Sequence, residues 1–449
     1  MLALVLSAIS LPIFVSDVSP FETFPAFPGA AGYGAKAQGG RGGRIVMVTN
    51  LNDSGIGSLR ACIKETGPRT CVFQVGGVIR LERPIMIERN NSDLSILGQT
   101  APGDGILITI DHSSEPDKKT PVIVKGASSI VIRHIRIRPR FPNTVRNVDA
   151  LTVETSSDVY VDHVSGSWAT DENFNSYANA TNLTVAYSIF GEGLNKHSKC
   201  ALLGSDPTKP QRISFWRNAC ISNRDRNPDN NHYGGSCIEI VNNLLYNARS
   251  EWGEIFSQYT GGTPISYVGN YFKAGPSTIK ETFAINWNDT ESADPPQIFA
   301  SGNEVWAPRD KSVVMIAADT EPYMVAAPPC PLTVADIGGA TAAYREVTER
   351  AGAFPRDVVD RQLIEEVGPI GSGGRGSMKT APGDLPPMQP GTAYVDADGD
   401  GMADSVEAEF GAEAGLYDPW VVSDESGWAN IDRFMQWLSE ERLQGRYPE

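Results

Sequence analysis

Short runs of alternating apolar and polar residues recur between residues 128 and 305. Within one run, Ile213 and Phe215 would face one side of a strand, while Ser214 and Trp216 would face the other. Successive runs begin roughly 24 to 33 residues apart, which matches one coil of a solenoid better than a hairpin array. The runs read SSIVIRHIRIR, SDVYVDHVSGS, TNLTVAYSIFG, QRISFWRNACI, SCIEIVNNLLY, TPISYVGNYFK and PQIFASGNEVW.

Four consecutive runs carry an asparagine at the same offset: Asn218, Asn243, Asn270 and Asn303. Asparagine tolerates the left-handed backbone conformation and can bond to neighbouring main-chain groups. Stacked turns would align these amides into a ladder, which predicts an all-β fold, a right-handed parallel β-helix. A β-sandwich with asparagine-containing turns is the alternative, although sandwich strands recur every ~8–12 residues.

The composition changes after the repeats. Residues AAYREVTERAGAFPRDVVDRQLIEEV predict one or two short helices, and a proline- and glycine-rich linker follows. The last 54 residues are acidic and predict a separate, small α-helical calcium-binding unit. We therefore expect four parts: a leader at 1–23, the β-helix at 24–340, helices and linker at 341–395, and a calcium-binding tail at 396–449.

Residues 1–16 are short and apolar but have no Lys or Arg before the apolar run. We favour an export signal, and hence secretion, over an ordinary structured N-terminus. No later segment is apolar enough to span a bilayer. The six cysteines lack a Cys-x-x-Cys pair, which argues against structural zinc.

Two of the cysteines, Cys62 and Cys71, bracket a short polar loop and predict a local disulfide. Cys200, Cys220 and Cys237 either pair across neighbouring coils or are buried free thiols.

The chain has 449 residues and a formal net charge of −16, which argues against a nucleic-acid partner because counterion release needs a basic surface. At the level of the whole chain, the same excess of negative charge disfavours any other polyanionic partner. The 41% hydrophobic content is typical of a globular protein. We expect a monomer, because a β-helix buries its core without a partner.

A calcium-loop pattern lies near the C-terminus. Asp396, Asp398 and Asp400 alternate before Gly401, and Glu407 follows at the bidentate position. The Met402 carbonyl and a water held by Asp404 would complete the ligands. A solvated acidic turn is the alternative.

The sequence before this loop predicts no helix, so it resembles a dockerin-like calcium repeat of structural role. A weaker copy spans residues 424–433.

A second set of charged residues falls at similar points on successive predicted coils. Because coils stack about 4.8 Å apart, these side chains can face one site. Surface ion pairs of little energetic consequence are the alternative. The set comprises Asn147 and Asp149, then Asp171, Glu172 and Asn175, then Lys199, Arg224 and Arg226.

The chain resembles the pectate lyases over roughly residues 24 to 340. The resemblance rests on FPGAAGYGAKAQGGRGGRIVMVTNLNDSGIGSLRAC, GQTAPGDGI, NVDALTV, VYVDH, SWATDE and the R-x-P segment Arg226-Asn-Pro228. It implies calcium-dependent eliminative cleavage of polygalacturonate to unsaturated products.

The resemblance also implies roles for individual residues. Arg226 matches the family base, Lys199 a substrate carboxylate ligand, and Asp149 and Asp171 calcium ligands. Arginine normally stays protonated, so this role for Arg226 requires a cationic, calcium-rich pocket that lowers its pKa.

Three asparagines depart from the family pattern: Asn147 and Asn175 replace carboxylates, and Asn231 replaces a second arginine. Glu172 is then the expected substitute calcium ligand. Arg224 or His232 is the expected second cation.

Two other functions remain open at this point. A β-helix polygalacturonase would need two carboxylates flanking a water, and that family's adjacent Asp-Asp pair occurs nowhere in the chain. A non-catalytic polysaccharide-binding solenoid would keep the scaffold without the chemistry.

Overall fold

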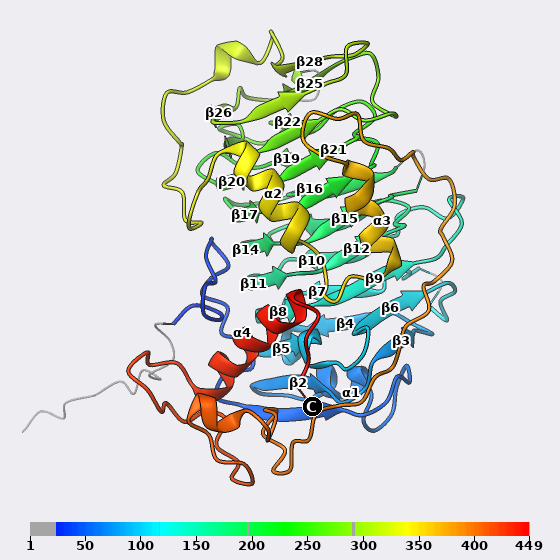
Figure 1. Cartoon of the computed structure of the whole chain (residues 1–449). Coiled ribbons are helices and arrows are strands. Elements are labelled where there is room, and N and C mark those ends of the chain that lie inside the picture. Colours follow the sequence, from blue (N-terminus) through cyan, green and yellow to red (C-terminus); the bar gives the residue numbers. More distant parts are fainter. Residues whose placement is uncertain (1–23, 116, 195–196, 290–291, 449) are drawn as a thin grey trace, which may run out of the picture.

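The computed structural model describes residues 24–115, 117–194, 197–289 and 292–448, so the expected leader at 1–23 lies outside the described residues. Three parallel sheets wind around a common axis in about nine coils (Figure 1). The all-β solenoid predicted from the repeats is confirmed, and the sandwich alternative is wrong because every named strand pairs with a parallel neighbour from the next coil. None of the helices in the described ranges is long and apolar enough to cross a membrane.

From β2 onward, each coil contributes one strand to each sheet in turn, and β1 adds one more strand to the first sheet. The first sheet contains β1 (Arg44–Val48), β2 (Arg69–Phe73), β5 (Leu94–Leu97), β8 (Ser128–Arg133), β11 (Ser157–Asp162), β14 (Thr181–Ala186), β17 (Arg212–Trp216), β20 (Cys237–Val241), β23 (Pro264–Val268) and β26 (Gln297–Ser301). The second contains β3 (Gly77–Arg80), β6 (Ile106–Ile110), β9 (Ile135–Pro139), β12 (Ser165–Ser167), β15 (Ile189–Gly191), β18 (Ala219–Ile221), β21 (Leu244–Tyr246), β24 (Tyr271–Lys273) and β27 (Glu304–Trp306). The third contains β4 (Ile85–Glu88), β7 (Val122–Lys125), β10 (Leu151–Glu154), β13 (Glu172–Tyr177), β16 (Lys199–Leu203), β19 (Asp229–Asn231), β22 (Gly253–Phe256), β25 (Glu281–Trp287) and β28 (Ser312–Ile316).

The helical segments lie outside the three sheets. They are α1 (Leu59–Lys64), α2 (Ala340–Arg350), α3 (Val358–Val367) and α4 (Asn430–Leu443), with 3-10 turns η1 (Arg89–Asn91), η2 (Gly98–Thr100), η4 (Glu321–Tyr323) and η5 (Glu407–Phe410). Helix α1 packs its buried face, including Leu59 and Ile63, onto the first coils and closes that end of the apolar core.

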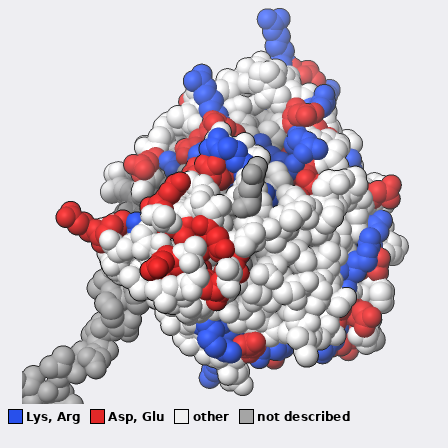
Figure 2. Space-filling view, turned by 60° about the horizontal axis from the view of Figure 1, so that its bottom comes forward, with Lys and Arg blue, Asp and Glu red and all other residues white. Residues whose placement is uncertain are grey.

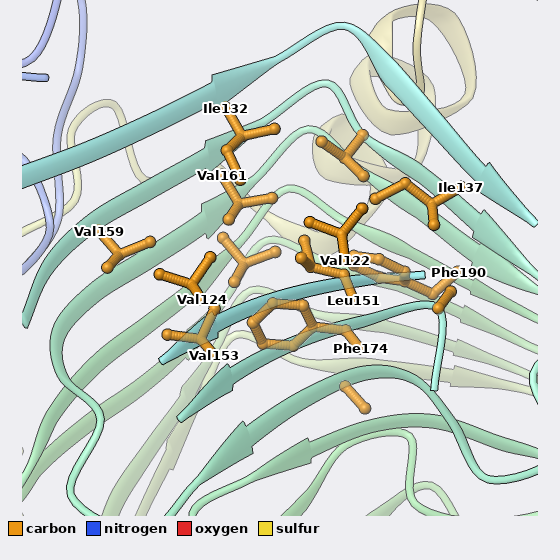
Figure 3. Close-up of a cluster of buried hydrophobic side chains, with 14 of the residues drawn as sticks. Val122, Val124, Ile132, Ile137, Leu151, Val153, Val159, Val161, Phe174 and Phe190 are labelled. Atoms are coloured by element: carbon orange, nitrogen blue, oxygen red, sulfur yellow. The ribbon is translucent and has the colours of Figure 1, made fainter. Parts of the chain in front are cut away.

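The core fills the space between the three sheets (Figure 3). Ile213 and Phe215 lie inside it, as the alternation predicts. Their neighbours Ser214 and Trp216 point outward yet are also buried, because other parts of the chain cover the first sheet. The outer face of the solenoid is therefore partly a second core.

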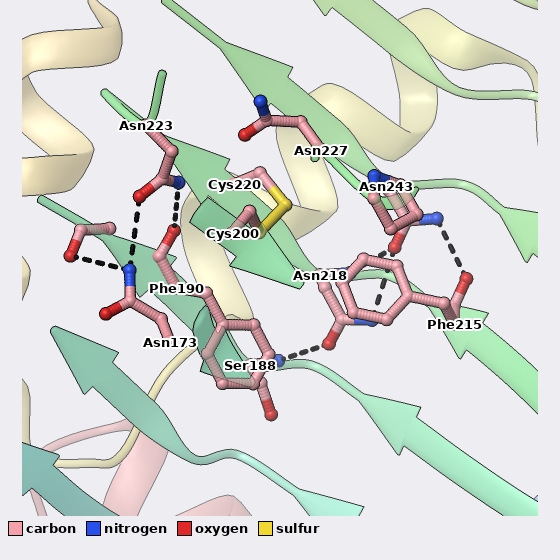
Figure 4. The surroundings of a disulfide bond; sticks show 12 residues. Asn173, Ser188, Phe190, Cys200, Phe215, Asn218, Cys220, Asn223, Asn227 and Asn243 are labelled. Carbon is pink, nitrogen blue, oxygen red and sulfur yellow. Dashed lines mark hydrogen bonds between the residues drawn. A yellow bond between two sulfur atoms is a disulfide. The ribbon is translucent and has the colours of Figure 1, made fainter. Parts of the chain in front are cut away.

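The asparagine ladder lies at the turn between the first and second sheets and is confirmed. Asn243 Oδ1 accepts the Asn218 main-chain N–H at 2.8 Å, and Asn270 Oδ1 accepts that of Asn243 at 2.9 Å. Asn303 continues the ladder to Asn270 at 2.9 Å (Figure 4 shows its Asn218–Asn243 step). Because each amide satisfies buried polar groups of the adjacent coil, the ladder fixes the register of the stack.

The backbone reason given for these asparagines is wrong in one respect. The left-handed residue of each turn is the one before the ladder position, as at Arg217 (φ 57°) and Asn242 (φ 52°). Its side chain points outward, and in earlier coils this position forms a stack: the rings of His134 and His163 lie 4.7 Å apart, and those of His163 and Tyr187 5.1 Å apart.

Three disulfides join the six cysteines. The predicted Cys62–Cys71 bridge is confirmed, and Cys200–Cys220 links neighbouring coils beside the ladder (Figure 4). Cys237 pairs instead with Cys330, 93 residues away, and the free-thiol alternative is wrong. Each bridge stabilises the fold mainly by restricting the unfolded chain.

The segments after the solenoid pack onto its outer faces. Helices α2 and α3 cover the second sheet, where Tyr344 and Leu363 join a core with Ile189 and Tyr246 (Figure 1). Helix α4 covers the lower strands of the first sheet in a core that includes Val131, Tyr160 and Phe434. The tail thus shares a core with the solenoid and does not form a separately packed unit; its domain boundary remains a prediction.

Replacing Asn243 with alanine should lower the free energy of unfolding by about 3 kcal/mol, because four hydrogen bonds to buried groups of two coils are lost. Asn303→Ala is the matched control: it removes three hydrogen bonds at the less buried end of the ladder, where water can replace them, and should cost about 1 kcal/mol. Denaturant unfolding of both variants measures the difference. Equal losses would contradict a ladder that acts through burial.

Candidate active site

The charged residues singled out in the sequence meet where successive coils enter the third sheet. Glu172 pairs in register with Lys199, and Lys199 pairs with Asp225 in the next coil. The coil below contributes Asp149, whose Oδ1 accepts the Glu172 main-chain N–H at 3.2 Å. One polar patch therefore spans four coils.

Three carboxylates form the acidic half of the site. Asp149, Asp171 and Glu172 each offer an oxygen, and these atoms lie within 4.8 Å of one another. Burial raises the pKa of Asp149, and burial together with the charges of both neighbours raises that of Glu172 well above its usual value. Buried carboxylates held this close repel one another, so the donor set fits a hard divalent cation.

Asn175 stands beside this group. Its Nδ2 donates to Asp149 Oδ2 at 3.0 Å, and its Oδ1 is buried with no hydrogen-bond partner. The amide thus orients one carboxylate and keeps a free oxygen nearby. Asn147, by contrast, is an exposed left-handed turn residue (φ 58°).

The basic half is neutralised by carboxylates. Arg226 pairs with Glu172, and its Nε lies 3.3 Å from Asp229 Oδ2. Lys199 is buried and pairs with Asp225. These ion pairs fix the orientation of the Arg226 and Lys199 side chains within the polar patch.

The expected role of Arg226 requires a cationic, calcium-rich pocket that lowers its pKa. The protein's own residues do not supply this charge by themselves. Burial does act to lower the pKa, but Glu172 and Asp229 outweigh it and raise the pKa of Arg226 above its ordinary value. Additional positive charge beside Glu172 and Asp229 would be needed to lower the pKa of Arg226.

Arg224 and His232, the two candidates for the second cation, differ in burial. Arg224 keeps 42% of its side chain exposed, and its Nε lies 3.7 Å from Asp225 Oδ2. His232 was a wrong choice: it is fully buried, its Nδ1 contacts Gln211 Oε1 at 2.7 Å, and burial lowers its pKa to about 3. Asn231 bonds to Gln258 and adds no charge.

Sequence reasoning missed four acidic residues on the same coils: Asp225, Asp229, Glu251 and Glu254. Asp229 and Glu254 pair in register on β19 and β22. No motif marks them, because only the lengths of the coils bring these residues together.

The tail loop lies at the lower end of the solenoid, where Figure 2 shows acidic side chains gathered. Asp396, Asp398 and Asp400 also bring their oxygens within 4.8 Å. Both oxygens of Glu407 and one each of Asp398 and Asp400 are buried without hydrogen-bond partners. Asp404 Oδ1 instead accepts the Ala397 main-chain N–H at 2.9 Å, which closes the loop.

Comparison with known proteins identifies the family. The chain is 35% identical over 416 residues to a probable pectate lyase C of Emericella nidulans, covering 91% of both chains, and 36% identical over 419 residues to that of Aspergillus terreus, covering 91% of this chain and 92% of the other. The chain belongs to the pectate lyase family. It is therefore a polysaccharide lyase, although no family model matches the sequence.

Solved structures support the fold. The cedar pollen allergen jun a 1 matches with a TM-score of 0.53 at 18% identity, covering 72% of this chain and 92% of the other. The thermostable pectate lyase PL 47 matches with a TM-score of 0.51 at 15% identity, covering 72% and 96%. The sequence similarity extends beyond residues 24–340. A match that covers 91% of this pectate lyase must include part of the tail.

Two variants separate the candidate cations of this pectate lyase. His232→Gln should leave the KM for polygalacturonate unchanged and lower stability by about 1–2 kcal/mol, because His232 acts inside the fold. Arg224→Gln should raise KM about tenfold, since an exposed guanidinium binds carboxylates strongly. Steady-state kinetics with thermal unfolding distinguishes them, and a raised KM for His232→Gln alone would contradict the assignment.

Proposed function

We propose that the protein is a secreted, calcium-dependent pectate lyase that cleaves polygalacturonate by β-elimination and releases unsaturated oligogalacturonides. The observation that carries this proposal is the convergence of Asp149, Asp171 and Glu172 beside Arg226 and Lys199, within a member of this family. The three disulfides support an oxidising compartment.

Charge explains why a metal is needed before the substrate. The patch contains more carboxylates than cations, and buried Lys199 and partly exposed Arg226 are already paired. A polyuronate would be repelled from it. Asp149, Asp171 and Glu172, with the Asn175 oxygen, would hold calcium and convert the patch into a surface for carboxylates.

The reaction removes the C5 proton of a uronate, forms a C4–C5 double bond and breaks the C4–O bond. The expelled glycosidic oxygen takes up a proton from solvent water. Bound calcium supplies positive charge that acidifies the C5 position beside a uronate carboxylate. Arg226 accepts the proton, and this role requires that the negative charge of Glu172 be compensated. Lys199 and Arg224 bind substrate carboxylates and hold the chain in register.

Wild-type protein should generate ultraviolet-absorbing unsaturated product from polygalacturonate with calcium and none with chelator. Arg226→Lys should reduce this rate at least a hundredfold with folding intact, because the proton acceptor is displaced. Arg375→Lys, an exposed arginine paired with Glu365, is the control.

Other results would contradict the proposal. New reducing ends without unsaturation would indicate a hydrolase, and neither product would indicate a binding protein. Near-normal turnover by Arg226→Lys would remove Arg226 as the base.

We propose a second, structural calcium in the tail, held by Asp396, Asp398, Asp400, Glu407 and the Met402 carbonyl. The support is the set of buried, unpartnered oxygens: Asp400 and Glu407 are 0% and 1% exposed. Burial raises the pKa of each to about 7. Asp404 takes part through loop closure.

The loop is positioned to stabilise the solenoid end. A Cβ placed on Gly401 would lie 3.2 Å from Ile45 and 3.5 Å from Ile431, so the loop fits between β1 and α4. Trp420 Nε1 also donates to the Gly43 carbonyl at 2.7 Å. Calcium would therefore hold α4 against the first coils.

Glu407→Gln should remove most of the calcium-dependent rise in melting temperature while leaving kcat within about twofold, because the tail loop packs against β1 and α4 and the site residues lie at β10 to β19. Asp424→Asn, in the weaker copy where Asp424 pairs with Arg433, is the control and should keep the calcium response. Calorimetry with and without calcium measures both. Loss of kcat in folded Glu407→Gln would contradict a structural role.

A further inference from the structure

Arg226 is held by more than the carboxylate it shares with the candidate metal site. Its backbone is left-handed (φ 52°), which is costly for a residue with a side chain. Its main-chain N–H donates to Glu254 Oε2 at 2.8 Å. Its Nε faces Asp229 Oδ2 at 3.3 Å.

These contacts belong to a brace between two coils. The Asn227 N–H donates to the Trp252 carbonyl at 2.8 Å, and the Glu254 N–H donates to the Pro228 carbonyl at 3.2 Å. The segment that carries Arg226 is thus tied to the next coil through its backbone, and the guanidinium is held by Asp229 of its own coil.

Asp229 and Glu254 differ from Glu172 in one respect. Among the described residues, Glu172 belongs to a three-carboxylate group with metal-binding spacing, and neither Asp229 nor Glu254 belongs to one. A cation held by Glu172 would compete with Arg226 for that carboxylate. The contacts to Asp229 and Glu254 would remain.

Both residues are built into the interior. Asp229 is 3% exposed and Glu254 is 9% exposed. Burial, a hydrogen bond to Glu251 and the charge of Asp229 raise the pKa of Glu254 to about 10, so it is a neutral carboxyl that accepts the Arg226 N–H. Asp229, whose pKa burial raises to about 6, carries the charge that faces the guanidinium above neutral pH.

We propose that Asp229 and Glu254 are positioning residues that keep Arg226 aimed at the substrate when Glu172 is engaged by calcium. Asp229 fixes the guanidinium through Nε, and Glu254 fixes the strained backbone. The inference rests on the proposed function, because it assigns these residues to the reaction of Arg226. Neither residue binds the substrate or the metal.

The test compares Asp229→Asn, Glu254→Ala and Glu254→Gln at pH 8 with calcium. Asp229→Asn and Glu254→Ala should lower kcat about 10- to 100-fold with KM and calorimetric calcium affinity unchanged, since a displaced acceptor slows proton removal without altering binding. Glu254→Gln should stay within about threefold of wild type, because an amide can replace a neutral carboxyl in both hydrogen bonds. Asp206→Asn, on an exposed loop beyond β16, is the control.

The outcomes are distinguishable. Normal kcat for both Asp229→Asn and Glu254→Ala overturns this inference alone, as does a loss confined to KM or calcium affinity. Loss of kcat in Glu254→Gln equal to that in Glu254→Ala also overturns it. If Glu254→Ala fails to fold, the isosteric Asp229→Asn decides. Absence of unsaturated product from wild type overturns the proposed function and this inference with it.

Discussion

The vertical register between coils is the constraint on which the rest of the structure depends. Parallel main-chain hydrogen bonds place each residue above a defined partner, as Glu172, Lys199 and Asp225 show. Inside the solenoid the register aligns apolar side chains and the asparagine ladder. Outside it, the same register assembles a polar patch from residues far apart in the chain. A slip of one residue would send the site side chains into the core.

This register brings carboxylates from successive coils together, a local concentration of charge that the net charge of the chain does not show. The net charge of −16 argues against a polyanionic partner, yet part of the acidic excess lies in two carboxylate groups with metal-binding spacing. At the third sheet, one group of carboxylates has metal-binding spacing. Carboxylates there also pair with Arg226 and Lys199 and hold them in place. In the proposed function, a divalent cation held by these carboxylates converts the patch into a surface that binds uronates. The net charge still predicts that the protein has no nucleic-acid partner.

The repeats predicted the fold because each strand and turn carries its own signal. Alternation at Ile213 and Phe215 and the offset of Asn243 are local features, and the solenoid follows from their repetition. No such local signal marks the pairing of Cys237 with Cys330, 93 residues away, or the partners of Arg226. Asp229 faces Glu254 only because the intervening coil has its particular length. His232 shows the limit most clearly, since its position after β19 turns an expected surface cation into a buried neutral ring.

The most direct test of the central claim is a crystal structure of the Arg226→Lys variant with calcium and an oligogalacturonate. The account predicts a calcium ion among Asp149, Asp171 and Glu172 that also contacts a uronate carboxylate, with the C5 proton of that sugar directed at residue 226. Lys199 and Arg224 should contact neighbouring carboxylates of the same chain. Calcium and oligosaccharide bound together elsewhere on the solenoid, with these three carboxylates free of metal, would contradict it.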